Sequence, residues 1–307
     1  MLRITADVYS GRPNPVADIT DEAEVRATLS ELTRDRTLFV GPRSSEAQTG
    51  GLGLRGFWVE TFDDGLARDF DLESRVFLPA GPQAPAGRAA EVAERLITTA
   101  DWHRAPDTFA GTTPPIGTSS FREFLLGQLA SGGRASVADR VEPAGGEQAE
   151  SPAVTCQIEL GAFNPGFWNN DPNVMSSNNC YNYASNWRTN TFAQPGRGCG
   201  NMYTQITCDE VTRAALCDGM HHRFDCFPDT EKPRFLVALV VIPGGGDYHW
   251  YRKHVEGFWG HKPGPTAARN VDNSGNVIFN PETADRGPYT IFCGYFYGCD
   301  SQRKRIN

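Results

Sequence analysis

All eight cysteines of this 307-residue chain lie between Cys156 and Cys299, and the first half of the chain contains none. Five of the six histidines also follow residue 154: His221, His222, His249, His254 and His261. This uneven distribution predicts two units of different character. The length is sufficient for two domains that each bury a core.

The boundary between the two units is predicted from a stretch that contains almost no large apolar residue. Residues 131–153 are rich in Gly, Ser, Pro and Glu, which is the composition of a flexible linker. We therefore predict a domain over 1–130, a linker over 131–153 and a domain over 154–307, with a Cys-rich insertion at 190–232.

Hydrophobic periodicity predicts an α+β fold for both units. The turn-rich segment Tyr9–Pro15 is interpreted as a structural loop. In the first unit the predicted strands are 3–8 and 54–62, and the predicted helices are 21–32, 88–98 and 121–130. In the second unit we predict a strand at 154–160, a short helix from Cys180, a strand at 234–242, a hairpin at 247–262 and a final strand at 289–297.

Charge and hydropathy limit the partners of the chain. The net charge of −8 argues against nucleic acid, which selects for clustered Lys and Arg. The longest apolar run, Phe235–Ile242, is too short to span a bilayer, so no membrane insertion is expected. The N-terminus lacks the apolar core of a secretory signal, which favours the cytoplasm by default. The density of cysteine instead points to export, so the compartment stays open.

Cys180 follows two asparagines, Asn178 and Asn179, which are good helix N-caps. Cys180 is therefore predicted in the first turn of a helix, where free backbone N–H groups and the macrodipole favour a thiolate. The same amides can bind an oxyanion formed by attack at a carbonyl.

Two histidines are predicted to share one face of a hairpin. The three-residue connection Val255-Glu256-Gly257 places Tyr251 opposite His261. His249 and His261 are then diagonal neighbours, roughly 7–8 Å apart by backbone position. This spacing suits a relay in which His249 takes the thiol proton and His261 orients its ring. His254, at the hairpin tip, is expected to be solvated.

This order of residues resembles the NlpC-type bacterial cell-wall amidases and endopeptidases, which are papain-like hydrolases with a Cys-His-His triad. The resemblance covers the core of residues 154–307 and departs from the family at Asn-Cys-Tyr-Asn, where the usual signature is Asp-Cys-Ser-Gly. It implies a cysteine hydrolase in which Cys180 is the nucleophile, His249 the base and His261 the orienting group. Such an enzyme would cleave an amide or ester in a peptide or small molecule through an acyl-enzyme, without a cofactor. The residues expected around the substrate are Trp168, Asn178, Asn179, Tyr181 and Asp247, and Asp247 is also an alternative orienting group.

Two other interpretations stay open. The first is a zinc- or copper-binding or redox protein whose candidate ligands are Cys208, Cys217, His221, His222 and Cys226. Cys208 and Cys217 are predicted on one helix about two and a half turns apart, too far to bond to each other. The second is a non-catalytic binding module stapled by disulfides.

Overall fold

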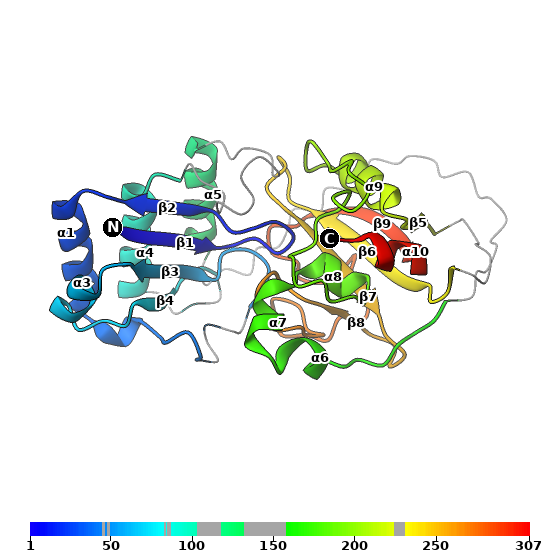
Figure 1. Cartoon of the computed structure of the whole chain (residues 1–307), viewed down its shortest axis with the longest axis horizontal. Helices are drawn as coiled ribbons and strands as arrows, with labels where there is room; N and C mark the ends of the chain where they lie inside the picture. The colour runs from blue at the N-terminus through cyan, green and yellow to red at the C-terminus, as the bar shows by residue number, and fades with distance from the viewer. Residues whose placement is uncertain are drawn as a thin grey trace.

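The computed structural model describes residues 1–44, 47, 50–82, 84, 87–102, 118–131, 158–223 and 231–307. Two antiparallel sheets, each with its own helices, lie side by side along the long axis (Figure 1). The predicted α+β class is confirmed. No helix of the described ranges combines the length and the apolar character needed to cross a bilayer.

The first sheet has the strand order β2-β1-β3-β4. Its strands are β1 (Leu2–Asp7), β2 (Val16–Ile19), β3 (Gly56–Thr61) and β4 (Arg75–Pro79). Its helical segments are α1 (Glu22–Thr33), η1 (Arg36–Leu38), α3 (Asp64–Asp69), α4 (Arg88–Thr99) and α5 (Thr118–Ala130).

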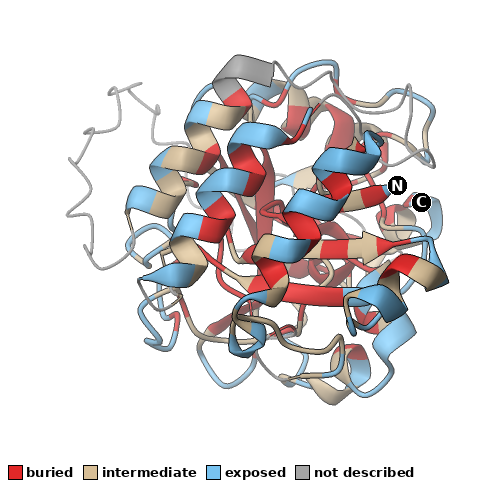
Figure 2. Ribbon diagram, turned by 90° about the vertical axis from the view of Figure 1, so that its left-hand side faces the viewer, coloured by how far each residue is buried: buried red, intermediate tan, exposed pale blue. Residues whose placement is uncertain are grey.

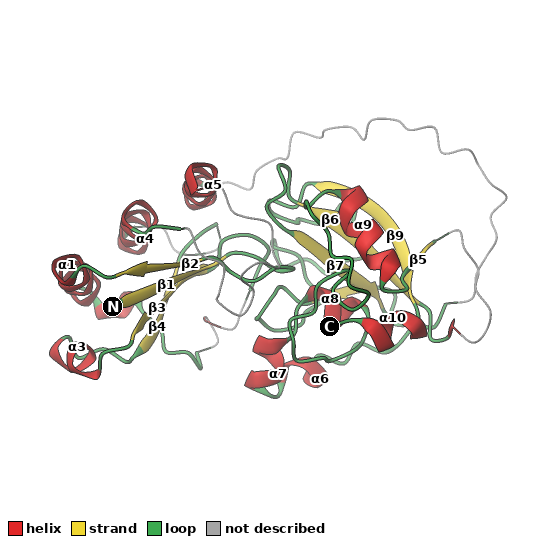
Figure 3. Ribbon diagram, turned by 45° about the horizontal axis from the view of Figure 1, so that its top comes forward, coloured by secondary structure: helices red, strands yellow, loops and turns green. Residues whose placement is uncertain are grey.

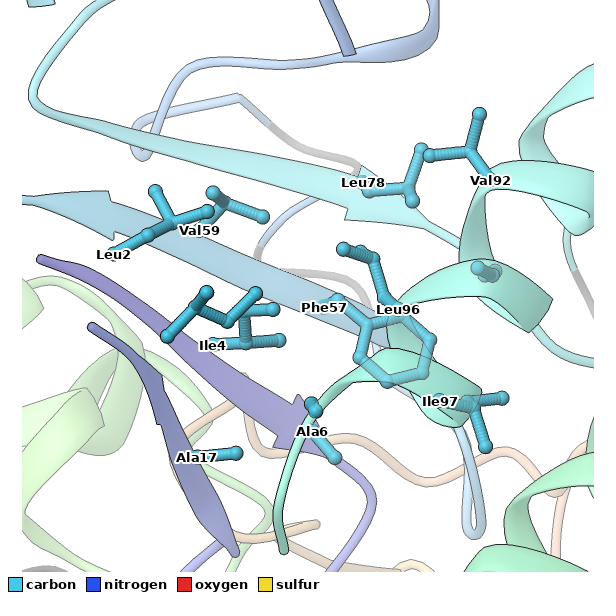
Figure 4. Close-up of a cluster of buried hydrophobic side chains, with 14 of the residues drawn as sticks. Leu2, Ile4, Ala6, Ala17, Phe57, Val59, Leu78, Val92, Leu96 and Ile97 are labelled. Carbon is cyan, nitrogen blue, oxygen red and sulfur yellow. The ribbon is translucent and has the colours of Figure 1, made fainter. Parts of the chain in front are cut away.

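Alternation along β1 creates the core of this unit. Leu2, Ile4 and Ala6 are fully buried and point to one face of the sheet, as expected for a period of two (Figure 4). Against them pack the apolar sides of α1 and α4, including Leu29 and Leu96. The outward sides of the helices are exposed, so each helix is buried along one stripe only (Figure 2).

The second sheet has the order β5-β9-β6-β7-β8. Its strands are β5 (His221–His222), β6 (Phe235–Val241), β7 (Tyr248–Lys253), β8 (Trp259–His261) and β9 (Ile291–Gly298). The helices of this unit are α6 (Gly166–Asn169), α7 (Pro172–Ser177), α8 (Cys180–Ala184), α9 (Cys208–Cys217) and α10 (Asp300–Arg305). Figure 3 shows α9 lying across β6 and β9.

The central strand β6 separates two apolar clusters. Val237, Leu239 and Val241 pack in one cluster with residues of α8 and α9. Ala238 and Val240 point the other way and pack with residues of the segment that follows β8. The neighbouring strand β7 is divided in the same way: Tyr248 and Trp250 belong to the first cluster and Tyr251 to the second.

The connection between β1 and β2 joins the two units. It extends from the first sheet to the second unit and ends beside β7 (Figure 1). A Cβ atom on Gly11 would lie 2.5 Å from the carbonyl oxygen of Tyr248, so this close approach requires glycine. The loop that the sequence identified only as turn-rich thus contacts the unit that contains the second sheet.

Most predicted elements are present within one or two residues of their predicted bounds. The sequence reasoning missed the short elements β2, η1, α3, β4, α6, α7, β5 and α10. The predicted linker from 132 onward, together with residues 154–157 of the predicted strand that follows it, lies outside the described residues.

Candidate functional site

Cys180 is the first residue of α8, as predicted. The side chain of Asn179 accepts hydrogen bonds from the N–H groups of Tyr181 and Asn182, and the Asn182 side chain accepts from the Asn179 N–H, which completes a capping box. The Cys180 side chain is fully buried, and its sulfur lies 4.0 Å from the carbonyl oxygen of Tyr248.

Burial decides the protonation state of this thiol. It raises the pKa of Cys180 well above the usual value, and the charge of Asp247 raises it further, against a smaller lowering by the Trp250 N–H. The prediction that Cys180 is a thiolate is therefore wrong. The helix of five residues offers too small a dipole to offset the loss of water around the sulfur.

The hairpin has the predicted register. Tyr251 pairs with His261, and the N–H of His254 donates to the carbonyl of Phe258. His249 Nε2 and His261 Nδ1 are 2.9 Å apart, so the two rings meet as predicted.

The hydrogen-bond partners of the two rings determine which ring nitrogens carry a proton. His261 Nε2 faces the carbonyl of Val271 at 3.0 Å and must donate to it, which leaves Nδ1 as an acceptor for His249 Nε2–H. His249 Nδ1 then accepts from the Ser10 hydroxyl at 3.0 Å. Burial lowers the pKa of His249 well below its usual value and that of His261 to about 3, so both rings are neutral.

Cys180 and His249 lie on opposite faces of the second sheet. Tyr248 and Trp250 pack in the same cluster as Cys180. His249 is paired with Val240, whose side chain belongs to the opposite cluster, and its ring contacts Tyr289. Because successive strand residues point to opposite faces, the His249 ring points away from the side of β7 on which Tyr248 and Trp250 pack with Cys180. Within the described residues the Cys180 sulfur has no hydrogen bond to His249 or His261, and the catalytic roles predicted for these three residues stay predictions.

Asp247 is held by the loop between β1 and β2. Its buried carboxylate accepts the backbone N–H groups of Ser10, Gly11 and Arg12 at 2.6, 3.0 and 2.9 Å, and the Tyr289 hydroxyl at 2.6 Å. Three successive N–H groups converging on one carboxylate form a backbone anion site. Burial raises the pKa of Asp247, while the Tyr289 hydroxyl and the amides lower it. The Ser10 hydroxyl lies between Asp247 and His249, 3.2 Å from Asp247 Oδ2 and 3.0 Å from His249 Nδ1.

The five residues predicted to contact substrate are all buried and hydrogen-bonded or packed inside the protein. The Asn178 amide donates to Val174 and Asn190, and the Asn179 amide donates to the carbonyls of Gly11 and Ala193. Trp168 packs on the ring of Tyr183, and the Tyr181 hydroxyl donates to Asp218. The contacts of Asp247 are those described above. A surface pocket of about 670 Å³ lies elsewhere, between residues 204–209 and 241–245.

Sequence reasoning missed two buried polar residues. Lys262 donates to the carbonyls of Met175, Asn178 and Gly264 at 2.5–2.6 Å, so it fixes the segment that leads into Cys180. Ser10 contacts both Asp247 and His249. No local pattern marks either residue, because their partners are distant in sequence. His254 is also buried, bonded to Tyr183 and Gly161, which corrects its predicted solvation.

Comparison with known proteins yields one informative relative. No family model matches the chain, and no solved structure matches it. The chain is 51% identical over 133 residues to Insoluble matrix shell protein 1 of Ruditapes philippinarum, a stretch that covers 43% of this chain and 86% of that protein.

The chain belongs to the family of Insoluble matrix shell protein 1. The similarity to a shell matrix protein points away from a hydrolase or peptidase, which corrects that prediction. The buried thiol and the opposed faces of β7 agree with this correction.

Four of the described cysteines of this member of the shell-protein family form two disulfide bonds. Cys208 bonds to Cys293 and Cys217 bonds to Cys199, so α9 is fixed at both ends. The two ends of α9 have separate partners, as predicted. Such bonds are typical of oxidising compartments, and they do not support the cytoplasmic default.

These bonds also correct the predicted set of metal ligands. Cys208 and Cys217 are in disulfide bonds and therefore cannot bind a metal as thiolates. The adjacent residues His221 and His222 point to opposite sides of β5, so they cannot both face one ion. Cys226 lies outside the described residues.

Proposed function

We propose that the chain is a non-catalytic, disulfide-stapled module of an extracellular matrix. The observation that carries this proposal is the 51% identity to a protein named for the insoluble matrix of a shell, over most of that protein's length. A matrix location also agrees with the disulfides, which form and persist outside the cell.

The interior of the second unit supports a structural role. A hydrolase needs a nucleophile that a substrate can reach, but Cys180, His249 and His261 have exposed fractions of 0%, 0% and 1%. Their polar atoms bond to other groups of the protein. The same side chains that resemble a catalytic set thus form a hydrogen-bonded core.

The two disulfide bonds support the proposal, because they help the folded protein to last in an insoluble material. The Cys208–Cys293 bond joins α9 to β9 across 85 residues of sequence, and the Cys199–Cys217 bond closes a loop of 18. Both reduce the freedom of the unfolded chain and so favour the folded state.

Sedimentation with an insoluble matrix tests the proposal. The oxidised full-length protein is mixed with the residue left after a shell is demineralised, and the fraction in the pellet is measured against protein concentration. We expect saturable binding that survives a high-salt wash. The variant Cys208→Ser/Cys293→Ser is measured in parallel and should bind less, because it lacks one disulfide bond.

Two results would contradict the proposal. One is a native protein that stays in the supernatant to the same extent as an unrelated acidic protein of similar size. The other is turnover of an amide or ester substrate that disappears in Cys180→Ser.

A further inference from the structure

Three side chains with different ligand atoms converge at the edge of the second sheet. They are His221 in β5, Glu231 ahead of β6 and Cys299 directly after β9, and their ligand atoms all lie within 4.8 Å of one another. The neighbouring order of β5, β9 and β6 explains why segments so far apart in sequence meet here.

The strand register fixes the position of each residue. His221 pairs with Tyr297 of β9, two residues before Cys299, so both lie at the same end of that strand. Phe235 of β6 pairs with Gly298, which brings the segment containing Glu231 to the same place. The N–H of Ser301 donates to Glu231 Oε2 at 3.2 Å and orients the carboxylate.

We propose that His221, Glu231 and Cys299 bind one zinc ion. Imidazole nitrogen, carboxylate oxygen and thiolate sulfur are all zinc ligands, and three protein ligands leave a fourth position for water or an outside donor. Cys299 is fully buried, whereas His221 and Glu231 are partly exposed, so the sulfur forms the inner side of the site and the other two ligands form its outer side.

The state of Cys299 sets this site apart from the other cysteines. Among the described residues Cys180 and Cys299 are the two free cysteines, and Cys299 alone has a histidine and a carboxylate within 4.8 Å. Its thiol lies 3.6 Å from the carbonyl oxygen of Tyr297. On binding, the sulfur bonds to zinc and the thiol proton passes to solvent. This site is independent of matrix binding.

Metal titration of the full-length protein tests the site. The protein is treated with a chelator and dialysed, and zinc is then measured by equilibrium dialysis and Co²⁺ by absorption spectroscopy. We expect one metal per chain and a thiolate-to-cobalt charge-transfer band. Cys299→Ser should abolish the band, and Glu231→Gln, a partly exposed change that keeps the size of the side chain, should weaken zinc affinity at least about tenfold.

Two matched variants serve as controls. His222→Ala removes the neighbouring histidine, whose ring lies 5.7 Å from that of Phe296, and Cys180→Ser removes the other free thiol. Both should bind zinc as the parent does. The proposal is overturned if the parent retains no zinc, if Cys299→Ser keeps the cobalt band, or if His222→Ala weakens binding as much as Glu231→Gln.

Discussion

The backbone N–H of Ser10 donates to the carboxylate of Asp247 across 2.6 Å, although the two residues are 237 positions apart. Gly11 extends the contact, because its carbonyl accepts from Asn179, Gln194 and Tyr248. The first unit therefore inserts a loop into the interior of the second. The polar groups around His249 are satisfied by this loop.

Asp247→Asn should destabilise the protein by at least about 3 kcal/mol, because the new amide N–H groups face donors and leave buried N–H groups unpaired. Equilibrium unfolding in urea measures the change. The exposed Asp209→Asn makes the same chemical substitution and should change stability little. Equal effects of the two variants would contradict the role given to Asp247.

Removal of the long-range staple should cost more stability than removal of the short one. From the loop lengths, Cys208→Ser/Cys293→Ser should lose about 4.5 kcal/mol and Cys199→Ser/Cys217→Ser about 3 kcal/mol. Thermal unfolding of the two double variants under oxidising conditions gives the comparison. If the short-range variant lost more stability, the disulfides would not act mainly by restricting the unfolded chain.

Stability should fall as the pH drops from about 6.5 toward 4.5. In the unfolded chain histidine titrates near 6.5, whereas burial lowers the pKa of His261 to about 3 and that of His254 to about 4. Over this interval the unfolded state binds more protons, so stability rises with pH. Glu210, whose pKa the Arg213 side chain lowers to about 2, loses its contribution only below its usual value near 4.5.

Urea midpoints at several pH values measure this slope, and His261→Gln should flatten it. The comparison between variant and parent cancels groups common to both, including Asp247, whose raised pKa acts with the opposite sign. An unchanged slope in His261→Gln would contradict the assignment of a neutral, buried imidazole.

The sequence was sufficient where structure is local. The capping residue Asn179 and the glycine of the 255–257 turn identified α8 and the hairpin, including the contact between His249 and His261. Hydrophobic alternation identified β1 and β6. The resemblance to NlpC-type amidases stays a prediction.

The position of Cys180 relative to His249 could not be predicted from the sequence, because it depends on which face of β7 meets α8. The sequence places His249 and Tyr248 on opposite faces but does not say which face Cys180 contacts. Burial of the thiol and the insertion of Ser10 are likewise properties of the assembled fold. The spacing of a motif along the chain therefore does not determine which of its side chains meet in the fold.

Site-resolved labelling of the native protein with iodoacetamide tests the central claim, that Cys180 is a buried core residue. Mass spectrometry at mildly acidic pH should find Cys180 unlabelled in the native protein and fully labelled after unfolding, because a covered thiol with a raised pKa offers little thiolate. Rapid stoichiometric labelling of Cys180 in the folded protein would contradict the account.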